Sequence, residues 1–248
     1  MTAAGPAAPG TTSPVIDRIE KFVRDIPGWT PVDQLMSLFL LAWSGRGVQG
    51  DIVEIGSWCG RSACVLGLAA SMDGGTHVHC IDPFPARDDW YRNDDGSWSL
   101  KVQAGAESVV AYDQQTVWAE PFERDILPVY ERFAGTLEAF RHSVASAGLE
   151  ATVTPFRGSI GGFLAAPAGR SVRSRLAFID GDHGYEAVCR DIREVERILV
   201  PGGWICFDDA FTTSAGVDRA ITECIIESPA YEQAQQLTRK LFVARRRG

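Results

Sequence analysis

Hydrophobic positions recur along most of the chain with the periods of short buried strands and of amphipathic helices. Five short apolar runs predict parallel strands, because a strand in a parallel sheet is buried on both faces. These runs are Asp51–Ile55, Thr76–Ile81, Ala151–Phe156, Arg175–Ile179 and Gly203–Phe207. Helical spacing between them predicts helices at Arg61–Ser71, Ile160–Ala166 and Tyr185–Leu199. Strands that alternate with helices in this way indicate a doubly wound α/β sheet.

Two further helices are predicted before the first strand, and one further strand near the end of the chain. Apolar residues recur at helical spacing at Val15, Ile16, Ile19, Phe22 and Val23, and then at Leu35, Leu38, Phe39, Ala42 and Trp43. The segment Leu237–Arg245 has the pattern of a last strand. We therefore expect a disordered tail at residues 1–14, which is rich in Ala, Gly, Pro and Thr, followed by one domain over residues 15–248.

The interval between Asp82 and Ala151 is too long for one crossover helix and predicts an insertion at about residues 85–150. Its first part mixes carboxylates with aromatic rings, at Asp88, Asp89, Trp90, Tyr91, Asp94, Asp95 and Trp98. That composition fits a lid over a binding site and equally a surface loop pinned by its two tryptophans. The last part predicts one amphipathic helix, with apolar residues at Ile126, Tyr130, Phe133, Leu137, Phe140 and Val144.

Composition and charge restrict the expected partners and location. A chain of 248 residues with 45% hydrophobic residues can bury one large core. Its net charge of −8, with Lys and Arg scattered, argues against nucleic acid as a partner. No apolar run approaches the roughly 18 residues that cross a bilayer, and the opening segment does not resemble a signal peptide. Six cysteines without a C-x-x-C pair suit a reducing compartment, so we expect a cytoplasmic protein.

The first predicted strand leads into a turn with two glycines, within the sequence IVEIGSWCGRS. Gly56 and Gly60 allow the backbone to approach a ligand closely, although any tight turn between a strand and a helix favours glycine. Asp82 ends the second strand 22 residues after Gly60 (82 − 60), near the roughly 20-residue offset at which a carboxylate meets ribose hydroxyls. The spacing Glu54-x-Gly56-x-x-x-Gly60 differs from the dinucleotide motif G-x-G-x-x-G. It therefore favours a nucleoside cofactor over a dinucleotide.

Carboxylates also follow the fourth and fifth predicted strands. They are Asp180, Asp182, Asp208 and Asp209, and His183 lies next to Asp182. The carboxyl ends of parallel strands meet at one edge of a sheet, where ligands bind. Acids gathered there repel one another unless a cation or protons neutralise them, and oxygen ligands prefer Mg²⁺ or a similar ion. Each acid could instead cap a helix and face solvent, but two adjacent strand ends with acids favour a divalent metal site.

With these residues and the turn Pro201-Gly202-Gly203, the sequence resembles the class I S-adenosylmethionine-dependent methyltransferases over about Asp51–Asp209. The resemblance implies a Rossmann-like, mostly parallel seven-stranded sheet with S-adenosylmethionine (SAM) as cofactor. It implies that the cofactor-binding residues are Glu54, Gly56, Ser57, Gly60, Ser62, Asp82, Ser159 and Asp180. Asp82 would hold the ribose diol, and Ser159 would lie near the adenine, where many relatives carry an acid.

The run Ile179-Asp180-Gly181-Asp182-His183, followed by Asp208-Asp209, resembles the metal-dependent macrocin-type sugar O-methyltransferases of antibiotic biosynthesis. That resemblance implies Mg²⁺ held by Asp180, Asp208 and Asp209, with Asp182 as general base. His183 is a second candidate for the base, because histidine titrates near neutral pH. A purely structural role for His183 at the start of the following helix stays open.

The sequence thus predicts an enzyme that transfers the methyl group of SAM to a hydroxyl of a small molecule, a sugar moiety of a natural product, with Mg²⁺ assistance. A nucleotide-binding oxidoreductase or a noncatalytic relative on the same fold is an alternative. So is a metal-independent methyltransferase that acts on a catechol or an amine. The expected partner is a small-molecule acceptor, without nucleic acid or membrane, and a homo-oligomer stays open.

Overall fold

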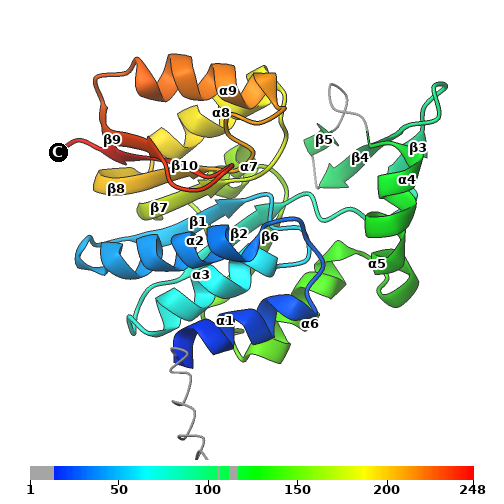
Figure 1. Cartoon of the computed structure of the whole chain (residues 1–248), viewed down its shortest axis with the longest axis horizontal. Helices are drawn as coiled ribbons and strands as arrows, with labels where there is room; N and C mark the ends of the chain where they lie inside the picture. Colours follow the sequence, from blue (N-terminus) through cyan, green and yellow to red (C-terminus); the bar gives the residue numbers. More distant parts are fainter. Residues whose placement is uncertain (1–13, 105–106, 112–116) are drawn as a thin grey trace, which may run out of the picture.

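A computed structural model of the chain describes residues 14–104, 107–111 and 117–248 (Figure 1). Of the tail predicted at residues 1–14, residues 1–13 lie outside the described part, whereas Pro14 begins a helix. The main sheet has seven strands in the order β6-β2-β1-β7-β8-β10-β9. They are β1 (Asp51–Ile55), β2 (Val78–Asp82), β6 (Val153–Arg157), β7 (Ser174–Ile179), β8 (Leu199–Phe207), β9 (Tyr231–Gln236) and β10 (Phe242–Arg246).

The five strands β6, β2, β1, β7 and β8 are parallel, whereas β10 runs antiparallel to both β8 and β9. The predicted doubly wound, mostly parallel seven-stranded sheet is therefore confirmed. The predicted last strand corresponds to β10. The pattern missed β9 because its sequence YEQAQQ is almost wholly polar, which suits an edge strand that faces solvent. β6 lies at the other edge, where its Pro155 is tolerated.

Helices cover both faces of the sheet (Figure 1). One face is covered by α1 (Pro14–Arg24), α2 (Val32–Ser44), α3 (Arg61–Ser71) and α6 (Thr136–Ala147). The other is covered by α7 (Ile160–Ala165), α8 (Tyr185–Glu196) and α9 (Ala215–Ile221). Two short helical turns extend α2 and α9, η1 (Gly45–Gly47) and η4 (Thr222–Ile226). All five predicted helices of these layers are confirmed, although α8 ends three residues before its predicted end.

Between β2 and α6 the chain leaves the main sheet and forms a small unit beyond the carboxyl ends of the parallel strands (Figure 1). Its three antiparallel strands, which the pattern did not predict, are β3 (Trp90–Arg92), β4 (Trp98–Ala104) and β5 (Glu107–Ala111). Its helical segments are η2 (Arg87–Asp89), α4 (Ala119–Pro121), η3 (Phe122–Ile126) and α5 (Leu127–Arg132). An aromatic core holds the unit together, with the rings of Trp98 and Phe122 stacked at 4.2 Å.

The prediction of one amphipathic helix across residues 126–144 is wrong, because α5 ends at Arg132 and α6 begins at Thr136. Gly135 between them is fully extended, with φ −177° and ψ 173°. The backbone N–H and the hydroxyl of Thr136 both donate to the carbonyl of Pro85, at 3.1 and 3.2 Å. The break is thus fixed by contact with the chain that leaves β2. α6 then packs on the sheet and forms the crossover from β2 to β6.

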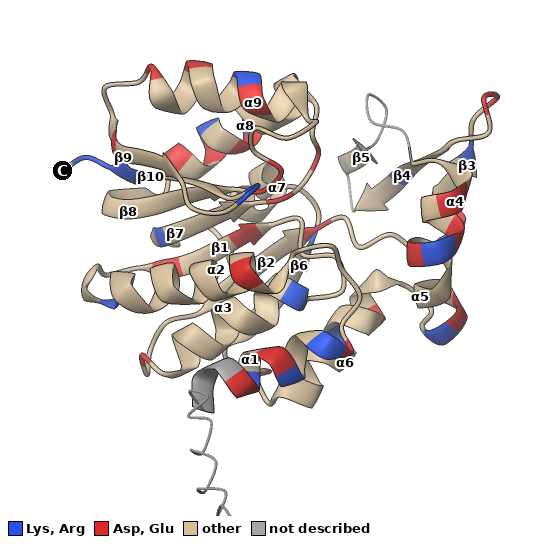
Figure 2. Ribbon diagram, viewed as in Figure 1, with Lys and Arg blue, Asp and Glu red and all other residues tan. Residues whose placement is uncertain are grey.

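Charged residues of both signs are interspersed on the outer helices α1, α4 and α9 (Figure 2). Within the described residues, no helix combines the length and the apolar character needed to cross a membrane.

Candidate active site

The turn between β1 and α3 touches the turn between β7 and α8 at Gly56. Gly56 has φ +87°, and a Cβ added to it would lie 1.9 Å from the carbonyl oxygen of Asp180. The N–H of Asp180 donates to the carbonyl of Ile55 at 2.8 Å, which holds the two turns together. Only glycine permits this approach. The first glycine of the motif is therefore required for the backbone contact that brings Asp180 beside the glycine turn.

Asp82 lies at the end of β2, only 5% exposed, and fixes the conformation of the same turn. Its Oδ2 accepts the backbone N–H of Trp58 at 2.9 Å, and its Oδ1 accepts that of Phe84 at 2.5 Å. Trp58 and Phe84 have φ +45° and +46°, a region that L-residues rarely occupy. Burial raises the pKa of Asp82 to about 6, against the effect of these hydrogen bonds. Asp82 therefore positions the turn, in addition to its predicted place beside the ribose.

Glu54 lies fully buried in β1 beneath the glycine turn. Among the described residues, neither of its carboxyl oxygens has a hydrogen-bond partner of good geometry, and the same holds for the hydroxyl of Ser57. Burial raises the pKa of Glu54 to about 7, which the nearby hydroxyls of Ser57 and Ser62 oppose. Buried polar atoms without partners are rare in folded proteins. Glu54 and Ser57 therefore retain hydrogen-bonding capacity beneath the glycine turn.

Ser159 is the N-cap of α7, since its hydroxyl accepts the N–H of Gly162 at 3.0 Å. The adjacent Gly158 donates its N–H to the backbone carbonyl of Asp82 at 3.0 Å. This bond brings the start of α7 next to the end of β2. Ser159 thus has a structural role at the position where adenine is predicted.

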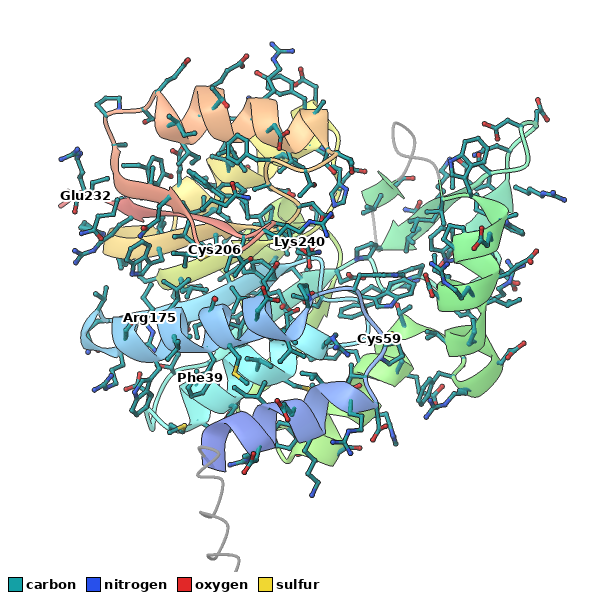
Figure 3. All side chains as sticks on the ribbon, viewed as in Figure 1. Phe39, Cys59, Arg175, Cys206, Glu232 and Lys240 are labelled. Atoms are coloured by element: carbon teal, nitrogen blue, oxygen red, sulfur yellow. The ribbon has the colours of Figure 1, made fainter. Side chains whose placement is uncertain are left out.

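Asp180, Asp208 and Asp209 converge at the carboxyl ends of β7 and β8, and Lys240, which Figure 3 labels, interacts with all three. Its Nζ is 2.8 Å from Oδ2 of Asp208 and 3.2 Å from Oδ1 of Asp209. The other oxygen of Asp208 accepts Nε2 of Gln34, in α2, at 2.6 Å. Asp208 is only 4% exposed, and each of its oxygens therefore already has a partner from the protein.

Asp180 completes the cluster of carboxylates. Burial and the neighbouring Asp208 raise the pKa of Asp180 well above its usual value, although Lys240 opposes the rise. Asp180, His183 and Asp209 each offer one ligand atom, and these three atoms lie within 4.8 Å of one another. A divalent ion therefore fits Asp180 and Asp209, two of the three predicted ligands, together with His183. Asp208, the third predicted ligand, is directed to Lys240 and Gln34 instead.

The two candidate bases have different partners. Asp182 accepts the N–H of Gly184 through Oδ1 at 2.6 Å, a local turn contact with the residue that precedes α8. His183 has Nε2 at 3.2 Å from Oδ2 of Asp209, and Nδ1 at 3.4 Å from the hydroxyl of Ser214. The structure thus gives Asp182 a local backbone role and places the His183 ring within the acidic cluster.

Sequence reasoning missed Gln34 and Lys240, which lie far from any motif, and also Arg61 and Trp29. The guanidinium of Arg61 donates to the carbonyls of Val23, Ile26 and Thr30, and so fixes the chain between α1 and α2 over the glycine turn. The ring of Trp29 lies 5.7 Å from that of Trp58. Arg61 follows Gly60 directly, so its position in the motif was a signal that could have identified it.

A cavity of about 300 Å³ lies beside this segment, between the α1–α2 connection and the inserted unit. Its lining includes Trp29, Arg124, Pro128, Arg132 and Phe133. Trp29 is 52% exposed. The cavity therefore combines an accessible indole ring with the guanidinium of Arg132 and with the ion pair of Arg124 and Asp125, close to the glycine turn.

The two tryptophans that suggested a lid belong to the core of the inserted unit. Trp90 is 4% exposed, and its indole N–H donates to the hydroxyl of Tyr130 at 2.7 Å. Trp98 stacks on Phe122, and the guanidinium of Arg87 lies 4.9 Å from the Trp98 ring. Both rings therefore stabilise the unit itself.

Comparison with known proteins identifies the class. A family model described as "Methyltransferase domain" matches residues 53–210, which include the glycine turn, Asp82 and the acidic cluster. The chain therefore belongs to this methyltransferase family, and it is a class I SAM-dependent methyltransferase, as its sequence predicts.

Solved structures with the same fold cover nearly the whole chain. The O-methyltransferase NovP has a TM-score of 0.63 and 16% identity, over 94% of this chain and 97% of NovP. An O-methyltransferase from Bacillus cereus in complex with SAH has a TM-score of 0.58 and 14% identity, over 97% and 94%. The calicheamicin methyltransferase CalS11, also described as a TDP-rhamnose 3′-O-methyltransferase, has a TM-score of 0.56 and 15% identity, over 98% and 99%.

Proposed function

We propose that the chain transfers the methyl group of SAM to a hydroxyl of a small molecule. The hydroxyl belongs to a sugar moiety of a natural product. The single observation that carries this proposal is the convergence of His183 with Asp180, Asp208 and Asp209 beside the glycine turn. Carboxylates and an imidazole at this place serve to orient a hydroxyl and to accept its proton. NovP and CalS11, which act as O-methyltransferases on the same fold, support the hydroxyl and the sugar as acceptor.

For the cofactor, we propose Glu54, Gly56, Ser57, Gly60, Ser62, Asp82, Ser159 and Asp180 as the residues that hold SAM. The unpartnered buried oxygens of Glu54 and Ser57 fit a polar ligand at the glycine turn. Asp82 offers its carboxylate at the end of the neighbouring strand. When bound, SAM supplies a methyl group on a sulfonium, which is the electrophile of the reaction.

For the proton, we propose His183 as the base. Asp209 orients the ring through Nε2, which leaves Nδ1, beside the Ser214 hydroxyl, to accept the proton of the acceptor hydroxyl. The same division of roles operates wherever a carboxylate fixes the orientation of a catalytic imidazole. Asp182, the other candidate, keeps its oxygen on the N–H of Gly184 and holds the start of α8.

For the metal, we propose that a divalent cation such as Mg²⁺ is held by Asp180 and Asp209, while His183 keeps the role of base and Asp208 stays with Lys240 and Gln34. When bound, such an ion lowers the pKa of an acceptor hydroxyl and fixes its direction. The acceptor itself is proposed to extend toward the cavity at Trp29. The indole ring of Trp29 can stack on a sugar, and Arg132 in the lining suits an anionic carrier group.

We also propose a cytoplasmic location, because the six cysteines are free thiols and five of them are buried.

The test of the proposed function is a transfer assay on the purified chain. The protein is incubated with SAM and a panel of nucleoside diphosphate sugars, glycosides, catechols and amines, with and without EDTA, and SAH formation is followed. Methylation of a sugar hydroxyl supports the proposal, whereas methylation confined to amines or catechols overturns the acceptor assignment. In a parallel thermal-shift measurement, SAH should raise the melting temperature and NAD should not.

A further inference from the structure

Lys240 is held in its place by the backbone around it. It lies in the turn between β9 and β10, which is closed by a hydrogen bond from the N–H of Leu237 to the carbonyl of Leu241 at 2.9 Å. The carbonyl of Lys240 accepts the N–H of Ala210 at 3.0 Å, and Nε2 of Gln236 donates to the carbonyl of Ala210 at 3.2 Å. The turn is therefore attached to the segment that directly follows the Asp208–Asp209 pair.

This attachment brings the ammonium group into the acidic cluster. The Lys240 side chain is 16% exposed, and its Nζ bridges Oδ2 of Asp208 and Oδ1 of Asp209, at 2.8 and 3.2 Å. Ion pairs at exposed sites contribute little, but this ammonium is mostly removed from solvent and faces two carboxylates at once. The cluster thus contains a positive charge that belongs to the chain.

A divalent ion and the Lys240 ammonium both require the carboxylate of Asp209. Asp209 is one of the three residues whose ligand atoms come together, and it is also paired with Lys240. A cation bound between Asp180 and Asp209 would lie near the ammonium, and two positive charges at that separation repel each other. Only one of them can be fully neutralised by Asp209.

We infer that Lys240 is the resident counter-ion of the acidic cluster, and that it competes with a divalent cation for the carboxylate of Asp209. This inference rests on the metal site of the proposed function. Lys240 is then a positioning residue: it holds Asp208 and Asp209 in place without the metal, and it keeps the affinity of the chain for divalent ions low.

The first experiment measures the binding of Mn²⁺, from the electron paramagnetic resonance signal of the free ion, to the full-length chain. Lys240→Met should bind Mn²⁺ more tightly than the unmodified chain, by about tenfold or more, because a competing charge has been removed. Lys240→Arg keeps the charge and should bind like the unmodified chain. Lys101→Met is the matched control, since Lys101 is an exposed residue of β4 in the inserted unit.

An unchanged or weaker Mn²⁺ affinity in Lys240→Met, with a folded protein by circular dichroism, would overturn the inference. The absence of Mn²⁺ binding in both Lys240→Met and the unmodified chain would overturn it too. If Lys240→Met does not fold, Lys240→Gln takes its place.

A second experiment follows the unmodified chain and uses a variant only to assign a signal. The chain has three lysines, Lys21, Lys101 and Lys240, so a sample with ¹³C-labelled lysine Cε gives three signals. Lys240→Arg identifies the signal of Lys240. Addition of Mg²⁺ should shift that signal and leave those of Lys21 and Lys101 unchanged. Saturation with metal without a shift of the Lys240 signal would show that the two cations do not compete.

SAH binding, measured by calorimetry on the same variants, separates this inference from the proposed function. Lys240→Met should retain SAH affinity, because Lys240 contacts the acids and not the glycine turn. If SAH does not bind to the unmodified chain, the proposed function fails. If SAH binds and only the Mn²⁺ comparison fails, the competition alone is overturned.

Discussion

Nε2 of His183 lies 3.2 Å from Oδ2 of Asp209, and the two side chains belong to the ends of neighbouring strands, β7 and β8. The His183 ring is 15% exposed, so it reaches solvent at the surface of the cluster. Asp182, its neighbour in the chain, instead binds a backbone N–H. The two residues that the sequence offered as alternative bases therefore differ in what they contact.

We expect His183→Gln to reduce turnover by about 10²–10⁴-fold, because glutamine cannot accept the proton of the acceptor hydroxyl. Asp182→Asn should retain most of the activity, since the asparagine carbonyl can still accept the N–H of Gly184. SAH formation is measured from pH 6 to 9 for both variants. Equal losses of turnover in the two variants, or a full loss in Asp182→Asn alone, would indicate that Asp182 acts as the base.

The buried carboxyl of Glu54 should make stability depend on pH. Burial raises its pKa from 4.5 to about 7, so the folded chain keeps a proton that the unfolded chain releases between these values. Stability therefore falls as the pH rises from about 4.5 to 7, by about 3 kcal/mol for this group alone. Glu54→Gln should remove this contribution to the decrease in the free energy of unfolding.

The free energy of unfolding of the cofactor-free protein, measured from pH 4.5 to 8, tests this expectation. Glu150→Gln is the control, since Glu150 is exposed and should leave the pH dependence unchanged. Parallel curves for Glu54→Gln and the unmodified chain would show that Glu54 does not titrate in this range.

The parts of the fold with a strong periodic pattern could be predicted from the sequence. β1 and α3 have the predicted bounds because an apolar strand, a glycine turn and an apolar helix follow one another without interruption. β9 could not be found in this way, since its exposed edge position removes the alternation of apolar residues. The division between α5 and α6 also escaped, because it depends on Pro85, about 50 residues earlier in the chain.

The candidate site shows the same division. Asp82, Asp180 and Asp208 each stand at the end of an apolar strand, so a rule of topology places them at one edge of the sheet. Lys240 and Gln34 reach that edge from a hairpin turn and from an N-terminal helix, and no spacing in the sequence relates them to Asp208. Acids at neighbouring strand ends predict a positive charge beside them, but no pattern in the sequence indicates that Lys240 supplies one.

Trp90 is expected to matter for stability and not for the acceptor. Its ring is 4% exposed, packs against Phe122 and is hydrogen-bonded to Tyr130. Trp90→Ala should destabilise the inserted unit by about 3–5 kcal/mol, as is typical for the loss of a buried aromatic ring. Limited proteolysis should then cut within residues 87–132 first. If the variant resists proteolysis but has a raised KM for the acceptor, Trp90 contributes to acceptor binding and not to stability.

Trp29 is expected to contribute to acceptor binding. It is 52% exposed and borders the cavity of about 300 Å³ next to the glycine turn. Trp29→Ala should raise the KM for the acceptor by about tenfold, as the loss of one stacking ring predicts, and leave SAH affinity nearly unchanged. Trp118→Ala is the matched control, because Trp118 is 55% exposed and does not line that cavity. Equal effects of the two substitutions would remove the cavity from the acceptor site.

Asp82 has two proposed roles, which one substitution and two ligands together can separate. Its carboxylate accepts the N–H groups of Trp58 and Phe84, and it is also the proposed partner of the ribose hydroxyls. Asp82→Asn keeps the shape, removes the charge and should weaken SAH binding by about 10–100-fold, as expected for one charged hydrogen bond. That loss by itself does not show which role is responsible.

A change in the ligand separates the roles. The 2′-deoxy analogue of SAH lacks one ribose hydroxyl, so it should bind the unmodified chain more weakly than SAH does. If Asp82 binds that hydroxyl, Asp82→Asn should no longer distinguish SAH from the analogue, because the interaction is already lost. If Asp82 acts only by holding Trp58 and Phe84, the substitution should weaken the binding of both ligands by the same factor. Calorimetric titration measures the four combinations of protein and ligand. Equal factors would show that Asp82 does not contact the ribose.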